Sequence, residues 1–179
     1  MAIDGKAYPL HTDFRVGIAF FQRLISGEAL TLGELYGLWY AEAVPEDAEV
    51  AREAIYSFYR CGREKTRTEE HPALAYAFGA DGSAIIAAFA REYRIDLTQE
   101  KMHWWRFSAL LEGLFAHSFS ERVRYRQCNP AEVKNKALRA EYQKLKRLYA
   151  LDEHGQAFKQ PQTLEEYNEY LLRRARGEG

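Results

Sequence analysis

The chain has 179 residues, 47% of them hydrophobic and 28% charged, which is enough for one sizeable core in roughly one domain. Its formal net charge of −1 at pH 7 gives no global field that would attract nucleic acid or a membrane surface. Two cysteines exclude a disulfide framework, and no apolar run is long enough to predict a membrane span or a signal peptide.

A short extended arm or hairpin is predicted first, because Asp4-Gly5 is a tight-turn pair. Apolar residues with the period of an amphipathic helix follow at Phe14, Ile18, Phe21 and Ile25. Asp13 or Thr12 can cap the first amides of this helix, and Gly27 can end it.

Two further helices are predicted before residue 63. Thr31 and Glu34 have the spacing of a capping box at the start of the second helix. Pro45 suits the first turn of the third helix, because a first turn leaves its amide positions unpaired. Gly62 can adopt the left-handed conformation that ends a helix, and the polar residues 63–82 then predict a loop.

The fourth and fifth predicted helices cover residues 81–93 and about 99–115. Asp96 or Thr98 can cap the fifth helix, and Ser118 begins a capping box for the sixth.

The fifth helix carries two adjacent tryptophans, Trp104 and Trp105, which follow His103. Each tryptophan ring needs roughly 150–250 Å² of partner surface, so the segment is either the centre of a core or a partner-binding face. Apolar residues on more than one side of this helix favour the core.

Two more helices are predicted towards the C-terminus. Asn129, followed by Pro130 and Glu132, is a strong start signal. The apolar stripe behind it comprises Leu138, Tyr142, Leu145 and Tyr149. Thr163 begins a last helix with its own stripe of Leu164, Tyr167 and Leu171.

The predicted fold is therefore all-α, a single-domain bundle of about six to eight helices with a short N-terminal extended arm or hairpin. Residues 1–151 form the helical domain, and residues 152–179 form a linker and a C-terminal helix.

The sequence predicts no catalytic, cofactor or metal site. The five histidines lack metal-binding spacings, and packing explains His103 better than a catalytic base does. Cys61 lies at a helix end, which disfavours a nucleophile, and no Gly-rich phosphate loop is present. We therefore expect a protein that is not an enzyme.

Charge is polarised along the chain. Residues 28–55 carry seven acids and one base, net −6, whereas residues 120–151 carry nine bases and three acids, net +6. A solvated basic face explains this pattern best, followed by contact with an acidic protein surface such as that of a second copy, and then by nucleic acid. The candidate partner-binding residues are Trp104, Trp105, Arg122, Arg126, Lys134, Arg139, Lys146 and Arg147.

Several stretches resemble one family of phage tail-region proteins, the bacteriophage gene-product-fifteen family. The most specific is His103-Trp104-Trp105-Arg106-Phe107; the others are residues 8–15, 58–62, 85–97, 125–126 and 142–151. The resemblance covers about residues 3–151. Where the family usually has Gly before Ile95-Asp96-Leu97, this chain has Arg94, so the usual left-handed residue is not predicted there.

The resemblance implies a tail-assembly chaperone, encoded by a phage or prophage, in the cytoplasm of the bacterial host. Such a chaperone coats the tape-measure protein and helps to recruit tail-tube subunits. The resemblance implies no catalytic residues for this chain. One alternative is a structural component of the virion tail or connector. A weaker alternative is a nucleic-acid-binding regulator that uses the basic face between Arg122 and Arg147.

Overall fold

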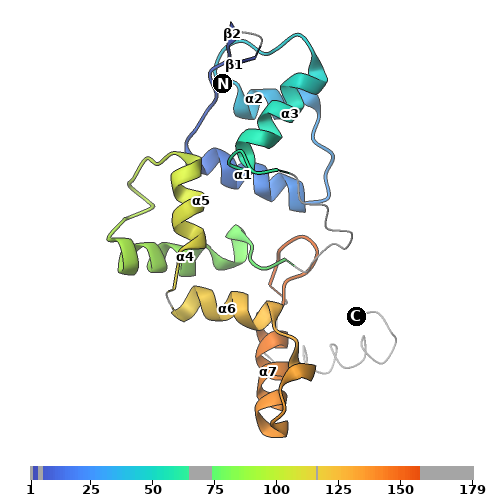
Figure 1. Ribbon diagram of the computed structural model, residues 1–179, viewed down its shortest axis with the longest axis vertical. Coiled ribbons are helices and arrows are strands. Elements are labelled where there is room, and N and C mark those ends of the chain that lie inside the picture. The colour runs from blue at the N-terminus through green and yellow to red at the C-terminus, as the bar shows by residue number, and fades with distance from the viewer. Residues whose placement is uncertain (1, 4–5, 65–73, 116, 158–179) are drawn as a thin grey trace, which may run out of the picture.

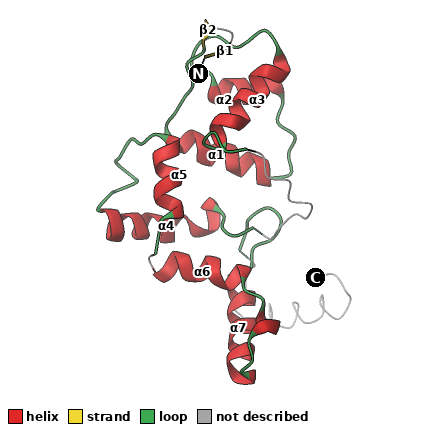
Figure 2. Cartoon of the chain, in the orientation of Figure 1, coloured by secondary structure: helices red, strands yellow, loops and turns green. Residues whose placement is uncertain are grey.

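Helices dominate the part of the chain that the structure, a computed structural model, describes: residues 2–3, 6–64, 74–115 and 117–157 (Figure 1, Figure 2). The helices are α1 (Phe14–Ile25), α2 (Leu32–Trp39), α3 (Ala48–Tyr59), α4 (Phe78–Tyr93), α5 (Trp104–Glu112), α6 (His117–Gln127) and α7 (Lys136–Tyr149), with a 3₁₀ turn η1 (Pro130–Glu132). An antiparallel hairpin of β1 (Ala2–Ile3) and β2 (Lys6–Ala7) precedes them. The all-α class is confirmed. The last predicted helix lies outside the described residues.

Predicted caps start the first two helices. The Asp13 carboxylate accepts a hydrogen bond from the Arg15 amide at 2.9 Å. Thr31 and Glu34 form the reciprocal capping box of α2. The third helix begins later than predicted, since Asp47 caps it and Pro45 lies outside its first turn. A carboxylate that accepts two first-turn amides explains this start.

The boundaries of α4 and α5 also differ from the prediction. Helix α4 begins at Phe78 rather than Asp81, because the Asp81 carboxylate turns back to accept the Ala77 amide at 3.1 Å. Helix α5 begins at Trp104 rather than near residue 99. The preceding backbone is extended and pairs with the start of α1, where the Phe14 amide donates to the Met102 carbonyl at 2.9 Å. His103 then caps α5.

The predicted start at Asn129 is wrong for α7. Asn129 caps only the short η1 turn, and the backbone becomes extended at Val133. Helix α7 begins at Lys136, where the Asn135 side chain accepts the Leu138 amide at 3.1 Å.

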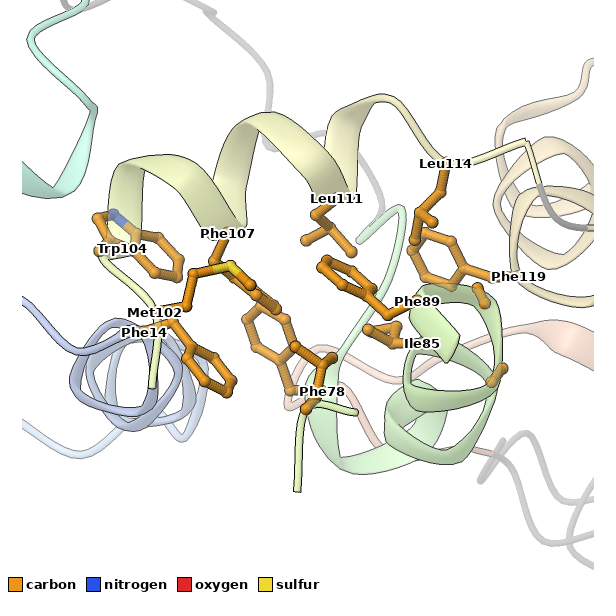
Figure 3. Close-up of a cluster of buried hydrophobic side chains, with 13 residues drawn as sticks. Phe14, Phe78, Ile85, Phe89, Met102, Trp104, Phe107, Leu111, Leu114 and Phe119 are labelled. Atoms are coloured by element: carbon orange, nitrogen blue, oxygen red, sulfur yellow. The ribbon is translucent and has the colours of Figure 1, made fainter. Parts of the chain in front are cut away.

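The core has two parts that meet at the end of α3. The α4–α5 core surrounds Phe107, whose ring stacks on Phe89 and Phe14 with centroids 5.3 and 4.7 Å apart (Figure 3). The α1–α3 core packs Phe20 edge-on against Trp39. Phe58 and Tyr59 pack against both parts. Helix α1 therefore contributes one buried ring to each part.

The tryptophan pair closes the junction between the two parts. Trp104 is buried and stacks on Tyr59, with centroids 5.2 Å apart and planes 9° from parallel. Its indole N–H donates to the Tyr59 carbonyl at 2.8 Å, and that of Trp105 donates to the Phe58 carbonyl at 2.8 Å. The Tyr59 carbonyl lies in the last turn of α3, where carbonyls lack intrahelical donors. The Phe58 carbonyl also accepts the Cys61 amide at 2.9 Å. The core interpretation is confirmed for Trp104.

Helix α4 ends in a left-handed residue at Arg94, with φ 57° and ψ 31°. The sequence did not predict this conformation, because the chain has Arg94 where the family usually has Gly, the residue that adopts positive φ without steric cost. The Arg94 side chain is exposed and does not obstruct the turn that ends the helix. In this turn the Ile95 amide donates to the Phe89 carbonyl at 3.3 Å. The backbone thus keeps the turn at the cost of a strained residue.

We predict that Gly17→Ala lowers the free energy of unfolding by about 2 kcal/mol or more. A Cβ at Gly17 would lie 2.2 Å from Cε3 of Trp104, whose ring is held by its stack and its hydrogen bond. Gly37→Ala, at an exposed helical position with no atom within 4 Å of a Cβ, is the control and should gain about 0.5–1 kcal/mol. If urea denaturation gives the same change in the free energy of unfolding for Gly17→Ala and Gly37→Ala, the packing of Trp104 on α1 is contradicted.

We also predict that Arg94→Gly raises the free energy of unfolding by about 0.5–1 kcal/mol, because glycine adopts positive φ without steric cost. Thermal unfolding followed by circular dichroism measures the change. Arg94→Ala, which removes the side chain but keeps Cβ, should give no such gain; a gain in both variants would trace the effect to the side chain instead.

Candidate functional site

The basic C-terminal unit, formed by α6, η1 and α7, is the strongest candidate site. Figure 1 shows α2 and α3 at one end of the described part of the molecule and α7 at the other. The acidic residues 28–55 therefore lie far from the basic residues 120–151.

Arg126 holds this unit on the rest of the fold. Its guanidinium is buried and donates from Nη1 and Nη2 to the two carboxylate oxygens of Asp81, at 2.5 and 3.0 Å. The same group donates to the Ala75 carbonyl at 3.1 Å and, through Nε, to the Tyr149 carbonyl at 2.5 Å. One side chain of α6 thus joins the start of α4 to the end of α7.

Asp81 is the buried acceptor at the centre of this joint. It is fully buried, and Arg122 donates to it as well, at 3.3 Å. Burial by itself raises the pKa of Asp81, but the hydrogen bonds from Arg126 and the Ala77 amide outweigh burial, so its pKa lies below the usual range. The carboxylate is therefore ionised in the folded protein at neutral pH.

Aromatic packing attaches α7 to α6. The Tyr125 ring lies edge-on to Tyr142, with centroids 5.4 Å apart, and stacks on Tyr149 at 6.1 Å. The Lys146 ammonium donates to the Cys128 carbonyl at 2.6 Å, and Arg139 Nε donates to the Val133 carbonyl at 2.9 Å. These contacts cover one edge of the helix.

The other edge of α7 keeps apolar side chains in solvent. No residue of α7 is buried, and Leu138 and Leu148 are 44% and 42% exposed. Leu145 is half-buried between them. We call the α7 surface the set of these three leucines with the exposed bases beside them, namely Leu138, Leu145, Leu148, Lys134, Lys144 and Arg147.

The structure divides the eight predicted partner-binding residues into three groups. Trp104 is buried in the core and Arg126 in the ion pair, so neither side chain is open to a partner in this structure. Arg122, Arg139 and Lys146 are half-buried and bond to the protein itself. Three remain open to a partner: Trp105, Lys134 and Arg147.

Trp105 belongs to a separate groove, whose lining residues come from the segment before α1, from α3 and its end, and from the start of α5. Trp105 is 44% exposed and lines this open groove of ≈ 450 Å³ with Leu10, Phe58 and His103. Its indole N–H is already bonded to the Phe58 carbonyl, so only the ring face is available for contact.

The sequence analysis did not identify Asp81 as the partner of Arg126, although the helical positions of both residues indicate burial. Asp81 lies on the same helical stripe as Ile85 and Phe89, at i, i+4 and i+8. Arg126 likewise shares a stripe with the buried Phe119. A charge of each sign on two apolar stripes predicts a buried pair, because a lone buried charge is too costly.

The described residues contain neither a cluster of metal-ligand side chains nor a helix that could cross a membrane. No group of three or more His, Cys, Asp and Glu side chains there could hold a metal ion. Among the described helices, none combines the length and the apolar character that crossing a membrane requires.

Comparison with known protein families identifies the chain. The family described as Bacteriophage Gp15 protein matches residues 1–151, so the chain belongs to that family. This membership points to a structural or tail-region protein of a phage. Searches of curated proteins and of solved structures found no match.

We predict that Asp81→Asn lowers the free energy of unfolding at pH 7 by about 3–5 kcal/mol, because it leaves the Arg126 charge buried and unpaired. Glu49→Gln is the control; it breaks the exposed pair with Arg52 and should change stability little.

The same pair predicts how stability depends on pH. Because the pKa of Asp81 is lowered on folding, its contribution is complete above the unfolded value near 3.8 and is lost as pH falls through the folded value. The stability difference between wild type and Asp81→Asn should therefore shrink below about pH 4. A difference that stays constant from pH 7 to pH 3 would contradict the ionised pair.

Proposed function

We propose that this protein is a non-enzymatic tail-assembly chaperone that binds the tape-measure protein of its phage and aids assembly of the tail tube. It acts in the cytoplasm of the bacterial host, where the tail is built. The observation that carries the proposal is the α7 surface, an apolar helical edge that the fold leaves open and borders with basic side chains.

The shape of the α7 surface suits a helical partner. Its exposed leucines, Leu138 and Leu148, are ten residues apart, which is about 15 Å along a helix. We expect the tape-measure protein to present long apolar helices, whose apolar stripes fit an edge of this kind. The neighbouring Lys144 and Arg147 favour acidic side chains on the partner.

The energy available at this surface suits a temporary complex. Full burial of a leucine contributes about 1.5–3 kcal/mol, and both exposed leucines are already more than half covered. Two such side chains therefore add only a few kcal/mol before the costs of association. Because association costs roughly 4–15 kcal/mol, further contacts along the α7 surface must add to those of the two leucines. We expect the complex to be weak enough for tube subunits to replace the chaperone.

The structural alternative, a component of the virion tail or connector, agrees equally well with family membership. Mass spectrometry of purified phage particles separates the two functions. A chaperone should be absent from mature particles, whereas a component should be present at fixed stoichiometry. The weaker nucleic-acid alternative requires DNA affinity that falls steeply with salt.

We predict that Leu138→Asp/Leu148→Asp reduces co-purification of the tape-measure protein, on co-expression, by about tenfold or more. The substitutions replace exposed apolar contacts and should leave the helical circular dichroism spectrum unchanged. Leu32→Asp, at a leucine of α2 that is 48% exposed, is the control and should bind like wild type.

Equal recovery of the tape measure with all three proteins would exclude the α7 surface as the binding site. No recovery with wild type would contradict the chaperone function itself.

A further inference from the structure

The start of α3 carries acidic side chains around one exposed apolar side chain. Val50 is 39% exposed, Glu49 precedes it, and Glu53 lies one turn on, at i+3. Glu42 and Glu46, in the loop that leads into α3, are exposed as well. We call the α3 patch the set of Glu42, Glu46, Glu49, Val50 and Glu53.

The acids of the α3 patch exceed the bases that pair with them. Arg52 pairs with Glu49, and Arg60 pairs with Glu53. Of the ion pairs that the described residues form, none includes Glu42 or Glu46. The patch therefore keeps a net negative charge that a basic partner surface would offset.

The α7 surface presents the opposite charge beside its own exposed leucine. Leu148 is 42% exposed, Arg147 precedes it, and Lys144 lies one turn earlier, at i−4. Helix α7 as a whole carries five bases and one acid, net +4. The two surfaces thus share one arrangement, an apolar side chain with charges beside it, and differ in the sign of those charges.

Charge and position together select a second copy as the occupant of the α7 surface. Two α7 surfaces placed face to face would bring two charges of +4 together, and two α3 patches would bring acids together, so symmetric pairing is unfavourable. Helices α3 and α7 lie at opposite ends of the described part of the molecule, so one molecule does not join its own two surfaces (Figure 1). Opposite charges meet only when two copies are arranged head to tail.

We propose that, in the free protein, the α7 surface of one copy binds the α3 patch of a second copy. Each such pair leaves one unoccupied surface of each kind, so the association continues to further copies unless a ring closes. As a consequence that rests on the proposed function, the tape-measure protein competes with the second copy for the α7 surface and disperses the assembly.

Sedimentation velocity of the full chain tests this contact without the tape measure. At about 50 mM salt the weight-average sedimentation coefficient should rise with protein concentration, and at about 500 mM it should return to the monomer value, because salt shortens the range of charge attraction. A coefficient that is independent of concentration at the lower salt would overturn the proposal. Association that persists unchanged at the higher salt would overturn it too.

Reversal of charge identifies the two surfaces. Glu42→Lys/Glu46→Lys makes the α3 patch basic, and Lys144→Glu/Arg147→Glu makes the α7 surface acidic. Each variant alone should associate about tenfold or more weakly than wild type, because like charges then meet. An equimolar mixture should regain association, since each variant retains the surface that the other has lost. This recovery also shows that both variants are folded.

Two control variants carry the same changes in charge at exposed positions outside both surfaces. Glu64→Lys/Glu100→Lys matches the first variant, and Arg91→Glu/Lys101→Glu matches the second. Both controls should associate like wild type. Equal association in all variants, or a mixture that remains monomeric, would overturn the head-to-tail contact.

A tape-measure pull-down separates this proposal from the proposed function, because Glu42→Lys/Glu46→Lys leaves the α7 surface unchanged. If that variant loses self-association and captures at least as much tape measure as wild type, both proposals stand. Charge-dependent association without capture by any protein leaves the head-to-tail contact intact and refutes the proposed function. Capture by proteins that are monomeric in every condition refutes only the head-to-tail contact.

Discussion

The stack of Trp104 between α1 and the end of α3 is the contact on which the rest of the fold depends. The ring lies over Gly17, parallel to Tyr59, and its N–H satisfies a carbonyl that the end of α3 leaves unpaired. The backbone before it is drawn into an extended pairing with the start of α1. One residue thereby joins the α1–α3 core to the α4–α5 core, which explains why a glycine is required at position 17.

The C-terminal unit is attached by a buried charge pair in addition to apolar packing, because Phe119 of α6 lies in the α4–α5 core. Arg126 places all of its donor groups on Asp81 and on backbone carbonyls, so α6 and the end of α7 are positioned by hydrogen bonds of fixed geometry. This joint holds α7 at one end, and among the described elements α7 packs mainly on α6 and η1. The apolar edge left open by that arrangement is what the proposed function uses.

The sequence predicted the elements that depend on local chemistry and missed those that depend on distant contacts. The caps at Asp13 and Thr31 are local and were correct. The start of α5 was wrong, because strand-like pairing with α1 keeps the residues before Trp104 extended, and no local pattern encodes a partner ninety residues away. The burial of Arg126 was missed because its stripe with Phe119 predicts a buried pair only when it is combined with the stripe of Asp81 on a distant helix.

The central claim is that α7 is the face that meets the tape-measure protein. Cross-linking mass spectrometry of the complex, isolated from cells that express both proteins, tests it most directly with an amine-reactive reagent. We expect cross-links to the tape measure from Lys134, Lys136 and Lys144, and few from Lys101, which is exposed before α5. Cross-links concentrated at Lys101, with none from the three lysines around α7, would contradict it.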